Sequence, residues 1–483
     1  MLFLRNNQHF AGHELTLEVE KLEARQMLAG NVEVNLSGAG DLEIFGDDAS
    51  NRIEVVSDGQ TVTVSGQGTE LNGGDSPLQF SRASITNYVI DLGDGSDRVS
   101  LIANNDGGVG FAGPFAGTGI EIDTGDGNDR ITLTANNTGI STGFILDQLI
   151  IRAGEGDDRI LLEANNSGFV AGKGFDVGMQ TQILAGDGND RFTLNAKNGD
   201  GTGFEFSNQT TFFLGDGNNR VSMTAENSSP NTIGVSFAGN FDLQSGIGND
   251  RIEFEANNSH LTGGIVFQAN SESLITTSDG NDRVRLETNN SGDSLGIAAS
   301  NALSFTIATK AGNDRVELVA RNASESTGFF MRTNTVVDTG SGDDRLSFTA
   351  SNSQSNSTGF NFGTGSLAVR TESGRDRIDL TANNRDISDG FVFNDFSLES
   401  GVDSDRIQFR ANNRDSDSGF EINGDFLVNA GAGDDSLTLH QRNPGSIVVS
   451  ANANLLFDGG AGNSDRLRAN FSTAMLPIVN FES

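Results

Sequence analysis

Apolar and polar residues alternate in a short segment that recurs through most of the chain. Residues 131–135 read ITLTA, residues 252–256 read IEFEA and residues 378–382 read IDLTA. A strict period of two is typical of a β-strand with one buried face. The repeats contain no stretch with the 3.6-residue period of a helix. We therefore predict strands, and no helices, throughout this part of the chain.

Each alternating segment follows a glycine-rich turn, and the two belong to a repeat of about 31 residues. The turn reads Gly-x-Gly-x-Asp-Arg at residues 93–98 and returns twelve times with drift, at steps of 29 to 32 residues. The residue that ends the turn, here called the anchor, is arginine in all copies but one: Arg98, Arg130, Arg159, Arg191, Arg220, Arg251, Arg283, Arg315, Arg345, Arg377, Arg406, Ser436 and Arg466. An asparagine stands seven residues after each of the first twelve anchors, from Asn105 to Asn443.

Two further apolar stretches complete each repeat, so three short strands are expected per 31 residues. This favours one coil of a right-handed parallel β-helix over a propeller blade, which needs about 40 residues. Equivalent residues of successive coils would stack about 4.8 Å apart, so the asparagines would form a hydrogen-bonded ladder. The predicted fold class is all-β: a right-handed parallel β-helix (β-solenoid) of about 13 three-stranded coils with terminal caps.

The ends of the chain depart from the repeat and divide it into four parts. We expect residues 1–30 to form a leader or cap segment, residues 31–92 degenerate capping coils, residues 93–466 the β-helix and residues 467–483 a C-terminal cap. Caps are expected because an exposed β-edge invites aggregation. Residues 22–30, LEARQMLAG, are similar to a short motif near the start of many large bacterial cell-surface and secreted proteins.

Composition narrows the range of functions. The chain has 66 acidic against 31 basic side chains, a formal net charge of −35, and no cysteine. The missing cysteines exclude disulfides and thiolate metal sites. The acidic balance argues against a nucleic-acid partner, because phosphate recognition needs clustered Lys and Arg, and it favours cations. No apolar run approaches the roughly 18 residues of a membrane span.

The turn Gly-x-Gly-x-Asp resembles the hemolysin-type calcium-binding repeat, the glycine-rich nonapeptide of RTX proteins. In that family, stacked turns present aspartate and carbonyl oxygens to Ca²⁺, a hard cation that takes about six to eight oxygen ligands. This chain departs from the family because the first glycine of the nonapeptide is absent and the turn occurs only once per coil. The resemblance implies Ca²⁺ as the cofactor and the following metal ligands: Asp94, Asp97, Asp126, Asp129, Glu155, Asp158, Asp187, Asp190, Asp216, Asp250, Asp279 and Asp282.

The acidic turns also admit an explanation without metal. Aspartate and asparagine favour tight turns through hydrogen bonds to their own backbone, and nearly every turn aspartate is followed by an arginine. Stacked columns of Asp and Arg could neutralise one another across coils. Both explanations stay open at this point.

These features together predict an extracellular or cell-surface module with a structural or adhesive role, and no catalytic residues. Acidic charge, the lack of cysteine and the millimolar calcium outside cells, which matches low-affinity sites, favour that location. The expected partners are calcium ions, with cell-surface polysaccharide or other surface proteins beside them. The alternative is a polysaccharide-active enzyme, a lyase or hydrolase, which needs paired carboxylates or a cationic base in a cleft. Repeat steps of 29 to 32 residues leave no long inserted loops to form one.

Overall fold

The computed structural model describes residues 30–105, 115–138, 142–167, 172–199, 201–230, 232–260, 263–268, 271–300, 302–414, 418–443, 446–462, 464–470 and 477–481. The predicted leader segment, apart from Gly30, and part of the predicted C-terminal cap lie outside these residues.

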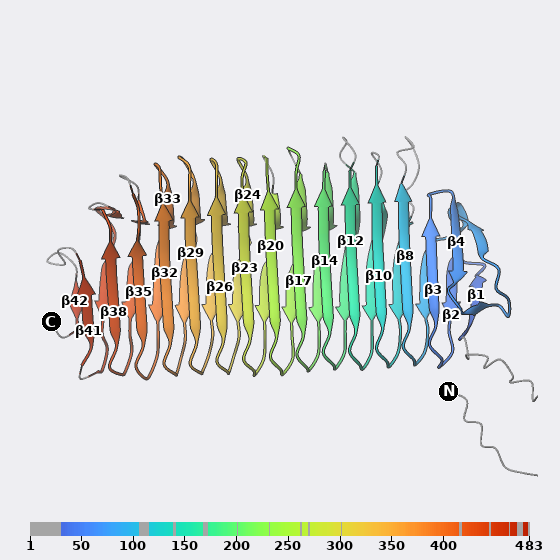
Figure 1. The fold of residues 1–483 in the computed structure, drawn as a ribbon, viewed down its shortest axis with the longest axis horizontal. Coiled ribbons are helices and arrows are strands. Elements are labelled where there is room, and N and C mark those ends of the chain that lie inside the picture. Colours follow the sequence, from blue (N-terminus) through green and yellow to red (C-terminus); the bar gives the residue numbers. More distant parts are fainter. Residues whose placement is uncertain are drawn as a thin grey trace, which may run out of the picture.

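Strands stack side by side along the whole length of the molecule (Figure 1). A sheet of sixteen strands contains the first strand of every coil. These strands are β8 (Arg98–Asn105), β10 (Arg130–Asn137), β12 (Arg159–Asn166), β14 (Arg191–Asn198), β17 (Arg220–Asn227), β20 (Arg251–Asn258), β23 (Arg283–Asn290), β26 (Arg315–Asn322), β29 (Arg345–Asn352), β32 (Arg377–Asn384), β35 (Arg406–Ala411), β38 (Ser436–Gln441) and β41 (Arg466–Ala469). Each begins at an anchor and pairs in parallel with its neighbours, so that Arg130 lies beside Arg98 on one side and Arg159 on the other.

The remaining strands of the coils belong to a second sheet of 26 strands. In the first three coils the second and third apolar stretches form one continuous strand: β9 (Phe115–Asp123), β11 (Phe144–Arg152) and β13 (Lys173–Leu184). The predicted three strands per coil are present from β14 onward, where the continuous strand is replaced by two short ones. The first short strands are β15 (Thr202–Phe206), β18 (Ile233–Phe237), β21 (Gly263–Phe267), β24 (Leu295–Ala299), β27 (Thr327–Met331), β30 (Thr358–Asn361), β33 (Asp389–Phe393), β36 (Phe420–Ile422) and β39 (Ile447–Val449). The second are β16 (Gln209–Phe213), β19 (Phe241–Gln244), β22 (Glu272–Thr276), β25 (Ser304–Ala308), β28 (Asn334–Asp338), β31 (Ser366–Arg370), β34 (Asp395–Glu399), β37 (Phe426–Asn429) and β40 (Leu455–Asp458).

The predicted fold class is confirmed: the chain is an all-β parallel β-solenoid with essentially no helix. It has about 11 turns, slightly fewer than the 13 coils predicted. Among its described residues, the last copy of the repeat forms the four-residue strand β41 and the two-residue strand β42 (Ile478–Val479). Strands this short do not complete a regular turn of the solenoid. The number of sequence motifs therefore overestimates the number of turns.

The N-terminal end differs from the coils because it contains antiparallel pairs. Its elements are β1 (Asn31–Leu36), β2 (Asp41–Phe45), β3 (Arg52–Ser57), β4 (Thr61–Gly66), β5 (Glu70–Leu71), β6 (Leu78–Ser81), the 3₁₀ turn η1 (Arg82–Ser84) and β7 (Asn87–Asp91). Strand β3 pairs in parallel with β8, whereas β4 pairs antiparallel with both β3 and β6. Antiparallel strands laid on the first coil protect the sheet edge that a solenoid otherwise exposes.

Inside the solenoid, like residues form columns. The rings of Phe144 and Phe175 stack with centroids 4.3 Å apart, and Phe204 continues the stack at 4.7 Å. Beside them a glycine column faces the alanine column of the first sheet: a Cβ on Gly203 would lie 2.5 Å from the Cβ of Ala196. The two sheets approach closely along this side because neither residue type has a larger side chain there.

Candidate functional site

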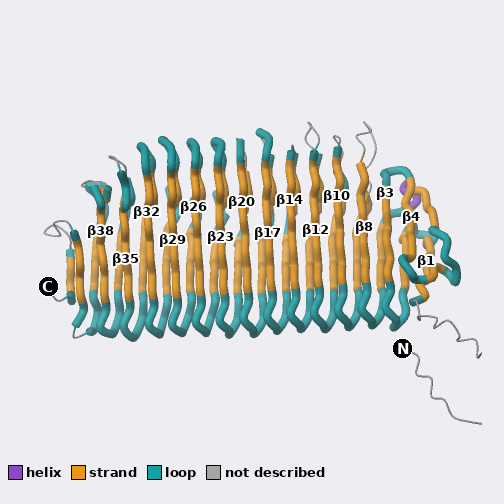
Figure 2. Tube along the Cα trace, viewed as in Figure 1, coloured by secondary structure: helices purple, strands orange, loops and turns teal. Residues whose placement is uncertain are grey.

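The solenoid has two polar edges, one at the glycine turns and one at the asparagines. The glycine turns form the regular row of loops along the lower edge in Figure 2. In the first five turns two glycines have positive φ, for example Gly93 at +75° and Gly95 at +140°, a region that other residues avoid. The turns are stacked tightly, since a Cβ on Gly127 would overlap the carbonyl oxygen of Gly95 at 1.5 Å.

The structure divides the twelve predicted metal ligands between two columns. The inner column points into the solenoid, and its members are at most 2 % exposed: Asp97, Asp129, Asp158, Asp190, Asp250 and Asp282. The outer column points into solvent and is exposed: Asp94, Asp126, Glu155, Asp187, Asp216 and Asp279. The carboxylates of one turn therefore do not converge. Within the described residues, no three His, Cys, Asp or Glu side chains form a group that could hold a metal ion.

The inner aspartates connect the turns through one carboxyl oxygen each. The backbone N–H of Asp97 donates to Oδ1 of Asp129 at 2.7 Å, and the N–H of Asp129 donates to Oδ1 of Asp158 at 2.7 Å. The pattern continues to the last coil, where the N–H of Asp435 donates to Oδ1 of Asp465 at 2.8 Å. The other oxygen, Oδ2, is buried without a hydrogen-bond partner in Asp97, Asp129, Asp158, Asp190, Asp250, Asp282, Asp314, Asp344, Asp376, Asp405 and Asp435.

Burial has a large effect on the acidity of this column. It raises the pKa of Asp158 to about 8, although the hydrogen bond from the Asp129 N–H acts in the opposite direction. It also raises the pKa of Asp97 to about 7 and that of Asp405 to about 8. Desolvation favours the neutral form of a carboxyl group, so the inner column retains protons at a pH where exposed carboxyls are ionised.

Two asparagines in the same column indicate what the unpartnered oxygens face. Asn219 occupies the place of an aspartate, and its Nδ2 donates to the carbonyl oxygen of Gly215 at 2.9 Å. Asn51 precedes the anchor position of β3, and its Nδ2 donates to the carbonyl oxygen of Asp47 at 2.9 Å. In an aspartate the same place is taken by Oδ2, which is an acceptor unless it is protonated. Two acceptors that face each other are balanced by a proton, a cation or a hydroxyl donor, and beside Asp129 and Asp344 the hydroxyls of Thr124 and Thr339 act to lower the pKa.

The anchor arginines do not neutralise the inner aspartates. Successive side chains of a strand point to opposite faces, so Asp97 is buried and Arg98 is exposed. The ion pairs of the anchors run to other acids on the outer face, such as Arg251 to Glu253 at 3.1 Å and Arg283 to Glu317 at 2.7 Å. Compensation between the Asp and Arg columns, the metal-free explanation considered above, is thus not the arrangement of the described residues.

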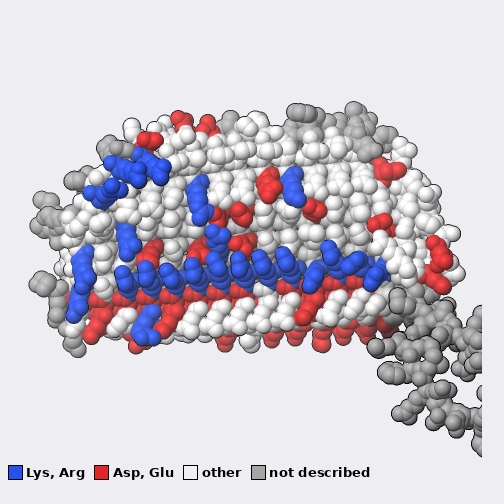
Figure 3. All heavy atoms as spheres, in the orientation of Figure 1, with Lys and Arg blue, Asp and Glu red and all other residues white. Residues whose placement is uncertain are grey.

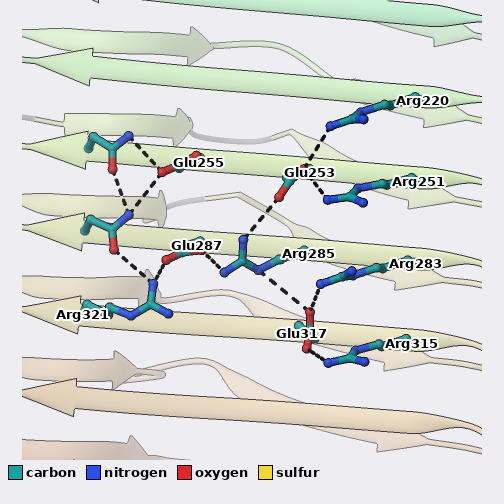
Figure 4. Close-up of polar contacts among 12 residues, drawn as sticks. Arg220, Arg251, Glu253, Glu255, Arg283, Arg285, Glu287, Arg315, Glu317 and Arg321 are labelled. Atoms are coloured by element: carbon teal, nitrogen blue, oxygen red, sulfur yellow. Dashed lines mark hydrogen bonds and ion pairs between the residues drawn. The ribbon is translucent and has the colours of Figure 1, made fainter.

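The anchor arginines instead form a continuous row on the outer face of the first sheet (Figure 3). In the middle of the molecule this row is part of an ion-pair network (Figure 4). Glu253 contacts Arg251 and also Arg285, the latter at 3.2 Å, while Arg285 and Arg321 both contact Glu287. Burial would raise the pKa of Glu253, but the two arginines outweigh it and lower the pKa. This row was not predicted from the sequence, although the strict alternation of the strand places every anchor on the outer face.

At the opposite edge the predicted asparagine ladder is confirmed. The Nδ2 of Asn166 donates to Oδ1 of Asn198 at 2.9 Å, and the same nitrogen donates to the carbonyl oxygen of Thr202 at 2.9 Å. Eight such amide-to-amide bonds join Asn137, Asn166, Asn198, Asn227, Asn258, Asn290, Asn322, Asn352 and Asn384. Each amide supplies both a donor and an acceptor, so the column satisfies its own hydrogen bonds.

A groove of about 800 Å³ runs along this edge across the ends of β10 to β23. Its lining consists of asparagine, serine and threonine together with Gly199, except that Lys197 and Glu226 stand where neighbouring coils have asparagine. Glu226 is the one carboxylate among the described lining residues. A glycosidase of the usual kind needs two carboxylates flanking the bond.

No protein-family model, curated protein or solved structure matches the chain. The class of protein therefore follows from the coordinates: a parallel β-solenoid repeat protein. Among the described residues, no helix is long and apolar enough to cross a membrane.

Proposed function

We propose that this chain is a rigid β-solenoid module with a structural or adhesive role outside the cell. The observation that carries the proposal is the unbroken ladder of nine asparagines from Asn137 to Asn384. Each rung repeats the same contacts with its neighbours, so the coils form one stiff body whose stability is a sum of similar interfaces.

The surface supports a role in display or adhesion. Outward residues of the first sheet recur at the strand spacing, and the charged ones gather in long rows (Figure 3). A flat face with regularly spaced polar groups suits a partner that is itself a repeating polymer. The net charge of −35 favours solubility, since like-charged molecules repel one another. The extracellular location rests on this charge, the lack of cysteine and the similarity of residues 22–30 to a surface-protein motif.

An antibody raised against the folded solenoid tests the location. It should label intact cells of the organism that makes the protein, and permeabilising the cells should add little signal. Purified protein added to the same cells tests adhesion, with heat-unfolded protein as the control. Labelling that appears only after permeabilisation would contradict an extracellular role, and equal attachment of folded and unfolded protein would contradict specific adhesion.

Calcium belongs to this proposal as a stiffener of the turn edge. Calcium binding is supported by the outer carboxylates of successive turns, which stack on one another. Oδ1 of Asp94 accepts a hydrogen bond from the N–H of Asp126 at 3.3 Å. Neither carboxylate has an ion pair among the described residues. Added calcium should raise the melting temperature of the whole chain relative to a strong chelator. The double variant Asp94→Asn/Asp126→Asn should reduce the shift, while Glu33→Gln/Glu70→Gln, which removes two exposed acids at the N-terminal end, should leave it unchanged. Identical melts in calcium and chelator would exclude this stiffening.

A polysaccharide-active enzyme remains the second candidate because the asparagine edge is grooved and contains Glu226. Such an enzyme should release reducing or unsaturated ends from a polysaccharide, and Glu226→Gln should abolish the release. Activity unchanged in this variant would remove the groove as the site.

A further inference from the structure

Four consecutive anchors near the N-terminal end form a row of exposed arginines: Arg98, Arg130, Arg159 and Arg191. Each pairs with the next as direct neighbours across the strands β8, β10, β12 and β14. Their backbones are therefore about 4.8 Å apart, the spacing of adjacent strands. Because all four occupy the same strand position, their side chains leave the sheet on the same side.

These four arginines are consecutive anchors without an acidic partner among the described residues. Of the later anchors, Arg345, Arg406 and Arg466 also have no ion pair there, but no two of them are consecutive. Arg251, Arg315 and Arg377 each form an ion pair with the acid two residues later on the same face, and Arg283 pairs with Glu317 at the equivalent position of the neighbouring strand. In the first four coils that position holds uncharged residues: Ser100, Thr132, Leu161 and Thr193. Within the described residues, none of the four arginines has a carboxylate within 4 Å.

The aspartates that precede these arginines do not offset their charge. Asp97, Asp129, Asp158 and Asp190 are buried on the other side of the strand and have raised pKa values. The acids of the turn edge are exposed, and among the described residues none of them forms an ion pair with the four arginines, so solvent and salt weaken their attraction. Four guanidinium groups at one-rung spacing repel one another in water, so a partner with negative charges at a similar spacing would bind favourably.

We propose that the row Arg98 to Arg191 binds a linear polyuronate, an acidic polysaccharide with one carboxylate on each sugar. This inference rests on the adhesive function proposed above and names the ligand class of one face. Guanidinium groups bind carboxylates through two parallel hydrogen bonds. One sugar of an extended polymer is comparable in length to one rung, so the carboxylates on the side of the polymer that faces the sheet can meet arginines of the row.

The neighbouring columns favour a sugar polymer over a nucleic acid. Hydroxyl and amide side chains lie beside the row, including Thr132, Thr134 and Asn136 on β10, and they suit the hydroxyl groups of a glycan. Single-stranded nucleic acids need aromatic side chains on which their bases stack. The exposed large hydrophobic residues of the described chain include two aromatics, Phe45 and Phe213, and both lie in strands of the second sheet.

Calorimetry with a polygalacturonate oligomer tests the proposal, with the whole chain and a strong chelator present so that calcium bridges do not contribute. The test variant replaces the four unpaired anchors by glutamine: Arg98→Gln, Arg130→Gln, Arg159→Gln and Arg191→Gln. The control makes the same change of charge at the four paired anchors: Arg251→Gln, Arg283→Gln, Arg315→Gln and Arg377→Gln. At about threefold per exposed contact, the test variant should bind about 80-fold more weakly, while the control should stay within about threefold. Raising the salt concentration should weaken binding by the wild type.

Neutral dextran and inorganic polyphosphate serve as comparison ligands. The proposal predicts no binding of dextran and weaker binding of polyphosphate than of polygalacturonate. It is overturned if polyphosphate binds more tightly, if both variants lose affinity equally, or if the folded wild type does not bind polygalacturonate. In the last case, attachment of the wild type to cell surfaces still reports on the adhesive function, so the two proposals fail separately. Thermal melts of each variant show that it is folded.

Discussion

The two edges of the solenoid differ in how their buried polar side chains are hydrogen-bonded. Each edge has a buried column of polar side chains, with asparagine at one and aspartate at the other. In the asparagine column, Asn166 receives a hydrogen bond from Asn137 and donates one to Asn198, so each amide between the two ends of the ladder both accepts and donates within the column. In the aspartate column, Asp129 uses one oxygen to accept the N–H of Asp97 and leaves the other without a partner.

The difference shows that a ladder depends on the balance of donors and acceptors. An amide has both, whereas an ionised carboxylate has only acceptors. A buried aspartate column becomes balanced when each carboxyl group carries a proton or contacts a cation. The asparagine edge should therefore be insensitive to pH and ions, and the aspartate edge should respond to one of them. The predictions that follow test this contrast, beginning with the largest effect.

The free energy of unfolding should fall as the pH rises from 6 to 8 and then level off. Burial raises the folded pKa of Asp129 to about 6 and that of Asp158 to about 8, above the value of about 3.9 in an unfolded chain. The folded state then binds more protons than the unfolded state, which lowers stability with rising pH. Each such residue contributes about 1.4 kcal/mol per pH unit, so Asp158, Asp344 and Asp405, with pKa values of about 8, give on the order of 4 kcal/mol per unit near neutrality.

Urea denaturation at a series of pH values measures this dependence. The window from pH 6 to 8 lies above the pKa of about 4 that a carboxyl group has in water, so the change measured there reports on the buried column. Stability that stays constant or rises between pH 6 and 8 would mean that the inner carboxylates are ionised in the folded state and balanced by cations.

Placing an aspartate in the asparagine column should destabilise the protein strongly. Asn166→Asp keeps the acceptor but removes the bonds to Asn198 and to the carbonyl of Thr202. Buried groups without partners cost about 1 to 3 kcal/mol each, so we expect a loss of about 3 to 5 kcal/mol at pH 7 in urea denaturation. Asn165→Asp is the matched control: it is the adjacent residue, half-buried, with one amide bond to Asn136, and should cost less than about 1 kcal/mol. Equal losses in the two variants would contradict the role of the ladder.

The fold could be predicted from the sequence because every copy of the repeat has the same pattern of buried and exposed positions. The alternation in residues 131–135 fixed which face is buried, and the constant spacing from Arg130 to Asn137 fixed the register that the structure confirms. The number of turns was slightly wrong because the end strands β41 and β42 are short. Strand length at an end depends on contacts that a sequence motif does not encode.

The candidate site was less predictable. The resemblance grouped Asp94 and Asp97 as ligands of one turn, but the strand that follows begins close to Asp97 and turns its side chain inward. Their separation depends on the backbone of the turn, where Gly95 has a φ of +140°. The difference between paired and unpaired anchors was readable in principle: Glu253 stands two residues after Arg251, and Thr132 two after Arg130.

The smallest effect is expected from converting one inner aspartate to the residue already found in the next coil. In Asp190→Asn, the new Nδ2 should donate to the carbonyl oxygen of Gly186, as Asn219 does to Gly215. The Oδ1 would still accept the N–H of Asp158. This replaces an unpartnered buried oxygen with a hydrogen bond, so the variant should gain about 1 to 3 kcal/mol at pH 8 in urea denaturation. At pH 5 the wild-type carboxyl carries its own proton, and the gain should be small.

Asp187→Asn is the matched control, since it removes the same charge from the exposed side of the same turn. It should change stability by less than about 0.5 kcal/mol at either pH. The sign of the Asp190→Asn effect at pH 8 separates the two ways of balancing the column. A gain in stability means that protons balance the column. The amide N–H donates its hydrogen bond at every pH, whereas the carboxyl group loses its donor proton as the pH rises. A loss that disappears when a chelator is added means that a cation occupies the space between Asp190 and the turn carbonyl, as the calcium resemblance implies.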